Sequence, residues 1–160
     1  MKIESIQNKV HSDFQSFEKM LNKWKFFEES IVFTNGCFDI LHYGHLAYLS
    51  QASEMGSRLI IGLNSDDSVR RLKGDKRPVN PQAARAMILA SLVMVDAVVL
   101  FDDDTPLDLI VKIMPNTLVK GSDYSIDQIA GAKEVLANGG EVKTIDYIAG
   151  YSTTNILNRK

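Results

Sequence analysis

The first 28 residues differ from the rest of the chain in how their apolar positions are spaced. Phe14, Phe17, Leu21 and Trp24 recur every three or four positions among polar residues, which predicts one amphipathic helix. We expect this helix to dock on the domain that follows. A helix that binds a partner or forms a dimer is the alternative.

From residue 31 onward, short continuous apolar runs alternate with helical patterns. The predicted strands are 31–35, 58–64, 96–101, 117–121 and 141–145. The predicted helices are 42–56, 65–72, 81–93, 105–114, 125–140 and 152–160, with caps expected at Ser65 and Thr105 and a stop at Gly139 and Gly140. Continuous apolar strands are typical of a parallel sheet that is covered on both faces.

This alternation predicts an α/β fold of the Rossmann-like, doubly wound type, a five-stranded parallel sheet with helices on both faces. We expect two parts, an N-terminal helical extension over residues 1–30 and one domain over residues 31–160. In such sheets ligands bind beyond the carboxyl ends of the strands, so the loops that follow strands carry the informative residues.

Composition narrows the possible partners. The 160 residues are 45% hydrophobic with a net charge of -2, which argues against a nucleic-acid partner but leaves a small anionic ligand open. Cys37 is the only cysteine, so no intrachain disulfide can form. The chain has no apolar stretch long enough to span a bilayer and no apolar signal-peptide core, so we expect a cytoplasmic protein with no membrane partner.

The loop after the first predicted strand reads GCFDILHYGH, residues 36–45. His42 and His45 are three positions apart and therefore share a helical face, with the side-chain-free Gly44 between them. Both imidazoles could donate hydrogen bonds to one phosphate group at this helix N-terminus. An incidental pair is the alternative, and a zinc site would need a third ligand, whereas His11 is the only other histidine.

Two more loops carry phosphate-binding chemistry. The loop RRLKGDKRP supplies basic residues for a polyphosphate clamp, with a solvated basic surface as the alternative; these residues are Arg70, Arg71, Lys73, Lys76 and Arg77. Arg85 on the next helix could reach the same site. The segment GYSTTN, residues 150–155, offers three hydroxyls at a predicted helix start, although such a cluster is also an ordinary N-cap.

Together these segments resemble one known family. VFTNGCFDILHYGHLAYL, GLNSDDSVRRLKGDKRPVN, VDAVVLFDDDTP, LVKGSDY and GGEV with GYSTTNI make residues 31–158 similar to the cytidylyltransferase-like nucleotidyltransferases with the HxGH signature. NSDDSVRRLKG with RPVN, and LVKGSDY, resemble most the branch that adenylates heptose 1-phosphate in ADP-heptose synthesis. That branch is often fused behind a sugar kinase. Because about 30 residues precede the first strand here, we expect a free-standing adenylyltransferase.

The resemblance implies a reaction in which heptose 1-phosphate attacks the α-phosphate of ATP and pyrophosphate leaves, with Mg²⁺ on the triphosphate. The nucleophile is already an anionic phosphate oxygen, so positioning and charge stabilisation are sufficient without a general base. The implied partners are ATP and the sugar phosphate, and the family also implies a homodimer.

The resemblance also assigns roles to residues of this chain. The implied catalytic residues are His42, His45, Lys73 and Lys76, and either lysine could meet the α-phosphate. The implied nucleotide-binding residues are Asn35, Gly36, Cys37, Phe38, Gly44, Arg85, Ser152, Thr153 and Thr154. The implied substrate-binding residues are Asp39, Lys120 and Asp123, and Asp39 would orient either the loop or the substrate. No protein residue is assigned as a metal ligand.

One departure bears on the choice of nucleotide. Glycerol-phosphate cytidylyltransferases carry an Arg-Thr-Glu-Gly run before Ser-Thr-Thr, whereas residues 147–150 here are Tyr-Ile-Ala-Gly and lack the arginine. This favours the heptose branch. The alternatives are a CTP-dependent cytidylyltransferase of a small phosphorylated alcohol, a flavin-type adenylyltransferase, and a nucleotide-binding domain without catalysis.

Overall fold

The strands of the chain form one parallel sheet. The computed structural model describes residues 2–146, 148 and 151 of the 160. The strands are β1 (Val10–His11), β2 (Ile31–Gly36), β3 (Arg58–Asn64), β4 (Ala97–Phe101), β5 (Thr117–Gly121) and β6 (Glu141–Ile145). They lie in the order β1-β4-β3-β2-β5-β6, and every neighbouring pair is parallel.

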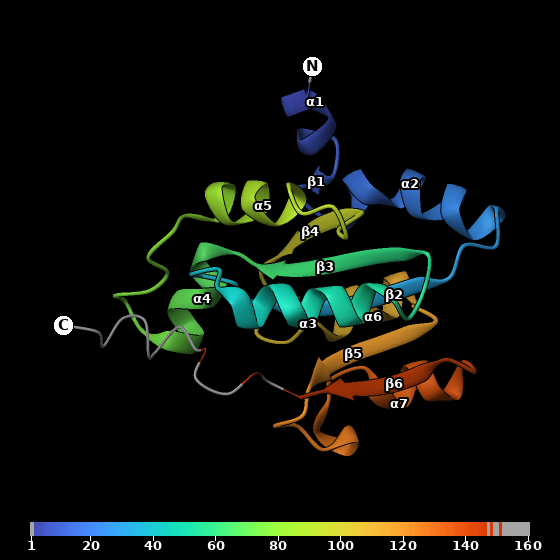
Figure 1. Ribbon diagram of the computed structural model, residues 1–160. Helices are drawn as coiled ribbons and strands as arrows, with labels where there is room; N and C mark the ends of the chain where they lie inside the picture. The colour runs from blue at the N-terminus through green and yellow to red at the C-terminus, as the bar shows by residue number, and fades with distance from the viewer. Residues whose placement is uncertain (1, 147, 149–150, 152–160) are drawn as a thin grey trace.

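Helices cover both faces of this sheet, as Figure 1 shows. The helices are α1 (Lys2–Gln7), α2 (Phe14–Phe26), α3 (Tyr43–Ser53), α4 (Asp66–Lys73), α5 (Gln82–Ala90), α6 (Leu107–Ile113) and α7 (Ala132–Ala137), with a 3-10 turn η1 (Ile126–Gln128). Apolar residues of α2, α6 and α7 pack in one core cluster, and those of α3 and α5 pack in another. Successive strand residues alternate between the clusters, as Val32 and Phe33 do. The predicted doubly wound α/β fold is therefore confirmed.

The sheet has one more strand than the five predicted. Val10 and His11 pair with Val98 and Val99 of β4, and the Val98 N–H donates to the Lys9 carbonyl at 2.8 Å. A strand of two residues is too short to give a periodic pattern, so the sequence shows no signal for it. The predicted N-terminal helix is α2, whose Phe17 and Leu21 are fully buried against the sheet.

The predicted helix over residues 125–140 was wrong in its middle. The chain forms η1 and α7 instead, separated by Gly131 at φ +82°. A residue with positive φ cannot continue a right-handed helix. The predicted Thr105 cap was also wrong, because Pro106 takes the N-cap position of α6 without a side-chain hydrogen bond. The Ser65 cap is confirmed, since its hydroxyl accepts from the Ser68 N–H at 3.0 Å. The predicted helix 152–160 lies outside the described residues.

The order of the strands places a crevice at the end of β2. From β2 the chain builds β3 and β4 on one side and then returns to build β5 and β6 on the other. At such a reversal the loops leave in opposite directions and open a space beyond the carboxyl ends of the strands. Here that space lies between the loops after β2 and β5. Among the described residues, no helix has both the length and the apolar character needed to cross a bilayer.

Candidate active site

Two adjoining cavities occupy the crevice. The larger has a volume of about 480 Å³ and the smaller about 140 Å³. The residues that line both cavities are Asn35, Gly36, Cys37, Lys73 and Lys120. This shared wall combines two cations with the backbone at the end of β2, so it is suited to an anionic group held between two binding spaces.

The two histidines of the HxGH segment lie against each other. His42 is the N-cap residue of α3, and His45 lies in the first turn of that helix. Their rings stack with centroids 3.8 Å apart and planes inclined by 24°. The His45 ring also contacts the Phe38 ring, with centroids 5.2 Å apart, and His45 lines the smaller cavity. The predicted shared face is thus observed.

Burial favours the neutral form of both imidazoles. Burial lowers the pKa of His42 below its ordinary value. Burial, together with the nearby His42 and Lys73, lowers the pKa of His45 to about 4. The Nδ1 atoms of both rings are buried and have no hydrogen-bond partner among the described residues. A neutral imidazole carries a single N–H, so each ring can donate one hydrogen bond through Nε2 without bringing a charge of its own.

Small residues and a strained backbone shape the loop around the histidines. Phe38 adopts φ 44°, a left-handed conformation that is rare for an aromatic residue, and its ring lies across Gly36. A Cβ at Gly36 would meet that ring at 3.0 Å, and a Cβ at Gly44 would meet the His42 ring at 3.1 Å. A side chain at position 44 would therefore crowd the His42 ring as well as any ligand bound beside it.

The lysines predicted to bind phosphate lie in different places. Lys73 ends α4 and lines both cavities, whereas Lys76 is exposed on the following loop and lines neither. Lys120, at the end of β5, donates to the Asn35 side-chain oxygen at 3.0 Å, and burial lowers its pKa. Asp123 lines the larger cavity. Lys73, which follows β3, and Lys120, on β5, therefore reach the shared wall from strands on either side of β2.

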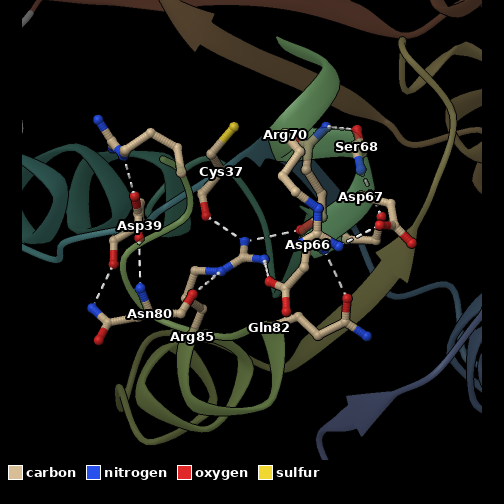
Figure 2. A network of polar contacts seen from close by, with 12 residues as sticks. Cys37, Asp39, Asp66, Asp67, Ser68, Arg70, Asn80, Gln82 and Arg85 are labelled. Carbon is tan, nitrogen blue, oxygen red and sulfur yellow. Dashed lines mark hydrogen bonds and ion pairs between the residues drawn. The ribbon is translucent and has the colours of Figure 1, made fainter. Parts of the chain in front are cut away.

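Arg85 lies within a network of polar contacts with Cys37, Asp66 and Asn80 (Figure 2). Its guanidinium donates to the carbonyls of Cys37 at 2.7 Å, Asn64 at 2.9 Å and Asn80 at 3.0 Å, and to the Asp66 carboxylate at 2.7 Å. The Arg85 side chain is completely buried and lines neither cavity. One cation thus ties together the loops that follow β2 and β3 and the segment that precedes α5.

Asp39 makes a second link between the same segments. Its carboxylate accepts from the backbone N–H groups of Val79 and Asn80 at 2.8 and 3.0 Å and from Arg77 at 2.5 Å. Burial alone would raise the pKa of Asp39, but these hydrogen bonds hold it below its usual value. Asp39 therefore orients the loop, which is one of the two roles expected for it, and it also lines the smaller cavity.

Three of the predicted site residues lie outside the described part of the chain, and the structure adds cavity-lining residues to which the sequence analysis assigned no role. Ser152, Thr153 and Thr154 lie outside the described residues. Further lining residues of the larger cavity are Asn64, Asp104, Thr105, Tyr124 and Gln128. Asn64 ends β3, so its place at a carboxyl strand end was available as a signal. Asp104 and Thr105 lie in VDAVVLFDDDTP and Tyr124 lies in LVKGSDY, two segments that carry the resemblance, whereas Gln128 in η1 lies in none of them. No group of three or more His, Cys, Asp or Glu suited to a metal occurs in the described part of the chain.

Comparison with family models decides the family. The cytidylyltransferase-like model matches residues 33–159, which include the histidine pair, the residues that line both cavities, most of β2 and all of β3 to β6. The chain belongs to the cytidylyltransferase-like family. The predicted family and the predicted enzyme class, a nucleotidyltransferase, are confirmed at this level.

Curated relatives of this family member are similar over most of the chain. The "Bifunctional protein HldE" of Actinobacillus pleuropneumoniae is 56% identical over 131 residues, which cover 82% of this chain and 28% of that protein. The protein of the same name from Rhodospirillum rubrum is 52% identical over 141 residues, 88% of this chain and 28% of that protein. The chain thus spans little more than a quarter of the length of these relatives.

Solved structures share the fold. The lipopolysaccharide core biosynthesis protein from Thermoplasma volcanium is 26% identical, with a TM-score of 0.61 over 78% of this chain and 99% of that one. Pantoate-beta-alanine ligase from Francisella tularensis has a TM-score of 0.63 over 92% of this chain and 75% of that one. At 14% identity, the second likeness shows the fold alone.

Proposed function

We propose that the chain transfers AMP from ATP to heptose 1-phosphate and releases pyrophosphate. The proposal rests on the resemblance of its motifs to the heptose adenylyltransferase branch and on its similarity to HldE proteins over 82% of the chain. The structural observation that carries it is the wall shared by the two cavities, which brings Lys73, Lys120 and the end of β2 to one place. We infer that the α-phosphate lies at this wall.

Two adjoining spaces suit a reaction between two phosphorylated substrates. The nucleophile is a phosphate oxygen that already carries negative charge, and it approaches another anionic phosphate. The main barrier is therefore charge repulsion, which fixed cations and N–H donors lower most effectively in a partly closed site. Lys73 and Lys120 supply that charge from elements on either side of β2, and neither has to give up a proton for the reaction.

In this proposal His42 and His45 act as neutral donors. The pKa of His45 at about 4 leaves its ring uncharged near neutral pH. We assign its proton to Nε2, because Nδ1 is buried without an acceptor among the described residues. Such a donor stabilises the charge that shifts onto the α-phosphate oxygens and the leaving pyrophosphate. The first-turn N–H groups of α3, which has no side-chain cap, would add to this effect.

The remaining predicted residues take supporting roles. Cys37 and Phe38 line the smaller cavity near the nucleotide, and Asp123 lines the larger one near the sugar phosphate. Arg85 acts through the loops that it holds and does not contact the nucleotide directly. Mg²⁺ enters as part of the ATP substrate and neutralises the triphosphate. A homodimer and a cytoplasmic location remain part of the proposal, carried by the family resemblance and the composition.

Pyrophosphate release in the presence of heptose 1-phosphate and Mg²⁺ tests this proposal directly. We expect turnover with ATP and little with CTP. Turnover with CTP alone would overturn the assignment of the nucleotide and move the protein to the cytidylyltransferases. Turnover with ATP and glycerol 3-phosphate or a flavin mononucleotide, but without heptose 1-phosphate, would overturn the assignment of the acceptor. A His45→Ala variant serves as the inactive control for contaminating activity.

A further inference from the structure

A third cavity lies away from the catalytic edge, beneath α2. It has a volume of about 520 Å³, and we call it the α2 cavity. Its walls include Arg58, the first residue of β3, and Asp96, which directly precedes β4. It therefore opens near the amino ends of these strands, whereas the crevice with His45 lies beyond the carboxyl ends. In Figure 1, α2 and β1 lie together along one border of the sheet.

The walls of the α2 cavity carry an excess of positive charge. The basic residues among its walls are Lys9, Lys19, Lys23 and Arg58. Asp96 is the only carboxylate among them, and it already pairs with Arg58 at 3.1 Å and accepts from the Leu59 N–H at 2.9 Å. Within the described part of the chain, Lys19 and Lys23 have no ion-pair partner. Arg58 also pairs with Glu29 at 2.7 Å, and the Lys9 ammonium donates to the Val95 carbonyl at 2.7 Å, so the positive charge that a ligand would meet comes mainly from Lys19 and Lys23.

Two buried nitrogens in these walls have no hydrogen-bond partner among the residues that the structure describes. They are Nε2 of His11 and Nε of Arg58, and both belong to residues that line the α2 cavity. His11 is only 9% exposed, and burial lowers its pKa, so the ring is neutral near pH 7. Buried donors are almost always paired in folded proteins, and each exception requires an explanation. Of the two, Arg58 Nε is a donor, whereas the neutral His11 ring donates to the Ser16 backbone through its other nitrogen, so its Nε2 is an acceptor.

An apolar wall completes the cavity. Met20 and Trp24 of α2 line it, and the Arg58 guanidinium lies over the Trp24 ring at 5.3 Å from the centroid. The Trp24 ring also meets the edge of Phe17, with centroids 5.6 Å apart. The indole is thus fixed in orientation beside the basic residues. A ligand that fits this wall has an apolar or planar body next to its anionic group.

We propose that the α2 cavity is a second ligand site, which binds a small organic phosphate. A phosphate carries nearly two negative charges and three acceptor oxygens, which match the several cations of these walls better than a carboxylate does. The apolar wall contacts the organic part of the ligand. The site is independent of the adenylyltransferase proposal, because it shares no residue with the catalytic crevice.

Trp24 allows binding to be followed at this site alone, because it is the only tryptophan in the chain. We would titrate the whole protein with phenyl phosphate and record Trp24 fluorescence, with inorganic phosphate and phenol as partial probes. We expect a saturable change with phenyl phosphate and weaker binding of both partial probes. A Lys19→Gln/Lys23→Gln double variant should bind about tenfold more weakly, because it loses charge-assisted hydrogen bonds.

Two control variants make the test decisive. Lys25→Gln removes one charge from the same helix at a position outside the cavity walls, so we expect nearly unchanged binding. Lys73→Ala alters the catalytic crevice and should leave the Trp24 titration unchanged. The proposal fails if no saturable change occurs, if phenol binds as tightly as phenyl phosphate, or if the double variant binds like Lys25→Gln. It also fails if Lys73→Ala abolishes the response, because the signal would then come from the crevice.

Discussion

Replacing Arg85 with methionine tests the view that one buried cation holds the active-site loops together. Methionine keeps part of the apolar volume but leaves three backbone carbonyls and the Asp66 carboxylate without their donor. Removing one partner of a buried ion pair costs about 3–5 kcal/mol of stability. Leaving several buried carbonyls without a donor costs a similar amount in total. We therefore expect Arg85→Met to lower the free energy of unfolding by about 4 kcal/mol.

Arg71 provides a matched control for this experiment. It also pairs with carboxylates, at 2.8 Å to Asp104, but its side chain is 45% exposed. Exposed pairs contribute little to stability, so Arg71→Met should leave the free energy of unfolding nearly unchanged. Denaturant unfolding measures both variants, and for a chain of this size the Arg85→Met loss corresponds to a drop of about 12 °C in Tm.

The catalytic readout separates positioning from general destabilisation. At a temperature where Arg85→Met is still folded, we expect its kcat to fall. The reason is that Cys37, just after β2, and Asn64, at the end of β3, no longer share one hydrogen-bond donor. Arg85→Lys should recover only part of the stability, since an ammonium cannot serve four acceptors in a plane. Equal losses of stability in Arg85→Met and Arg71→Met would refute the reasoning.

Three further predictions concern the crevice. Lys73→Ala should lower kcat/KM at least about tenfold, equivalent to about 1.4 kcal/mol, while Lys76→Ala stays within about twofold, both measured by pyrophosphate release; equal effects would remove the distinction between the two lysines. The folded-state pKa of His45, about 4, lies below its ordinary value of 6.5, so the unfolded chain takes up this proton first and stability is lost as the pH falls from 6.5 towards 4. Urea unfolding across that range should show a shallower acid loss in His45→Gln than in the parent, and parallel curves would contradict the assigned pKa. Asp39→Asn should lower stability by about 2 kcal/mol, because a charged acceptor of several hydrogen bonds becomes neutral, and an unchanged denaturation midpoint would contradict this.

Local patterns predicted the parts of the fold that repeat. The strand predicted at 58–64 is β3 without any change of boundary, because a buried parallel strand is a continuous apolar run with polar residues at each end. β1 was missed because two residues contain no period. The helix expected over 125–140 was broken by Gly131, which has φ +82° and where a Cβ would meet Ile110 at 2.6 Å, a contact between segments that local sequence does not reveal.

In the candidate site, too, features set by local sequence were predicted, whereas contacts between distant segments were not. The position of His42 and His45 on one face came from their spacing, and the observed stacking agrees with it. The separation of Lys73 from Lys76 could not be predicted, because it depends on where α4 ends and how the next loop turns. Likewise, Arg85 looked like a ligand contact in sequence, yet its partners are carbonyls from three segments that only the fold brings together.

The short strand β1 also covers an edge of the sheet to which another chain could otherwise bind. Without residues 1–12, the apolar strand β4 would become an open edge with unpaired N–H and C=O groups, a template on which a second chain can add a strand. The opposite edge, β6, is protected differently, since its exposed Glu141 and Lys143 place charges along the strand. The N-terminal segment therefore protects the sheet from edge-to-edge aggregation. A truncated protein that begins at residue 31 would lack this protection.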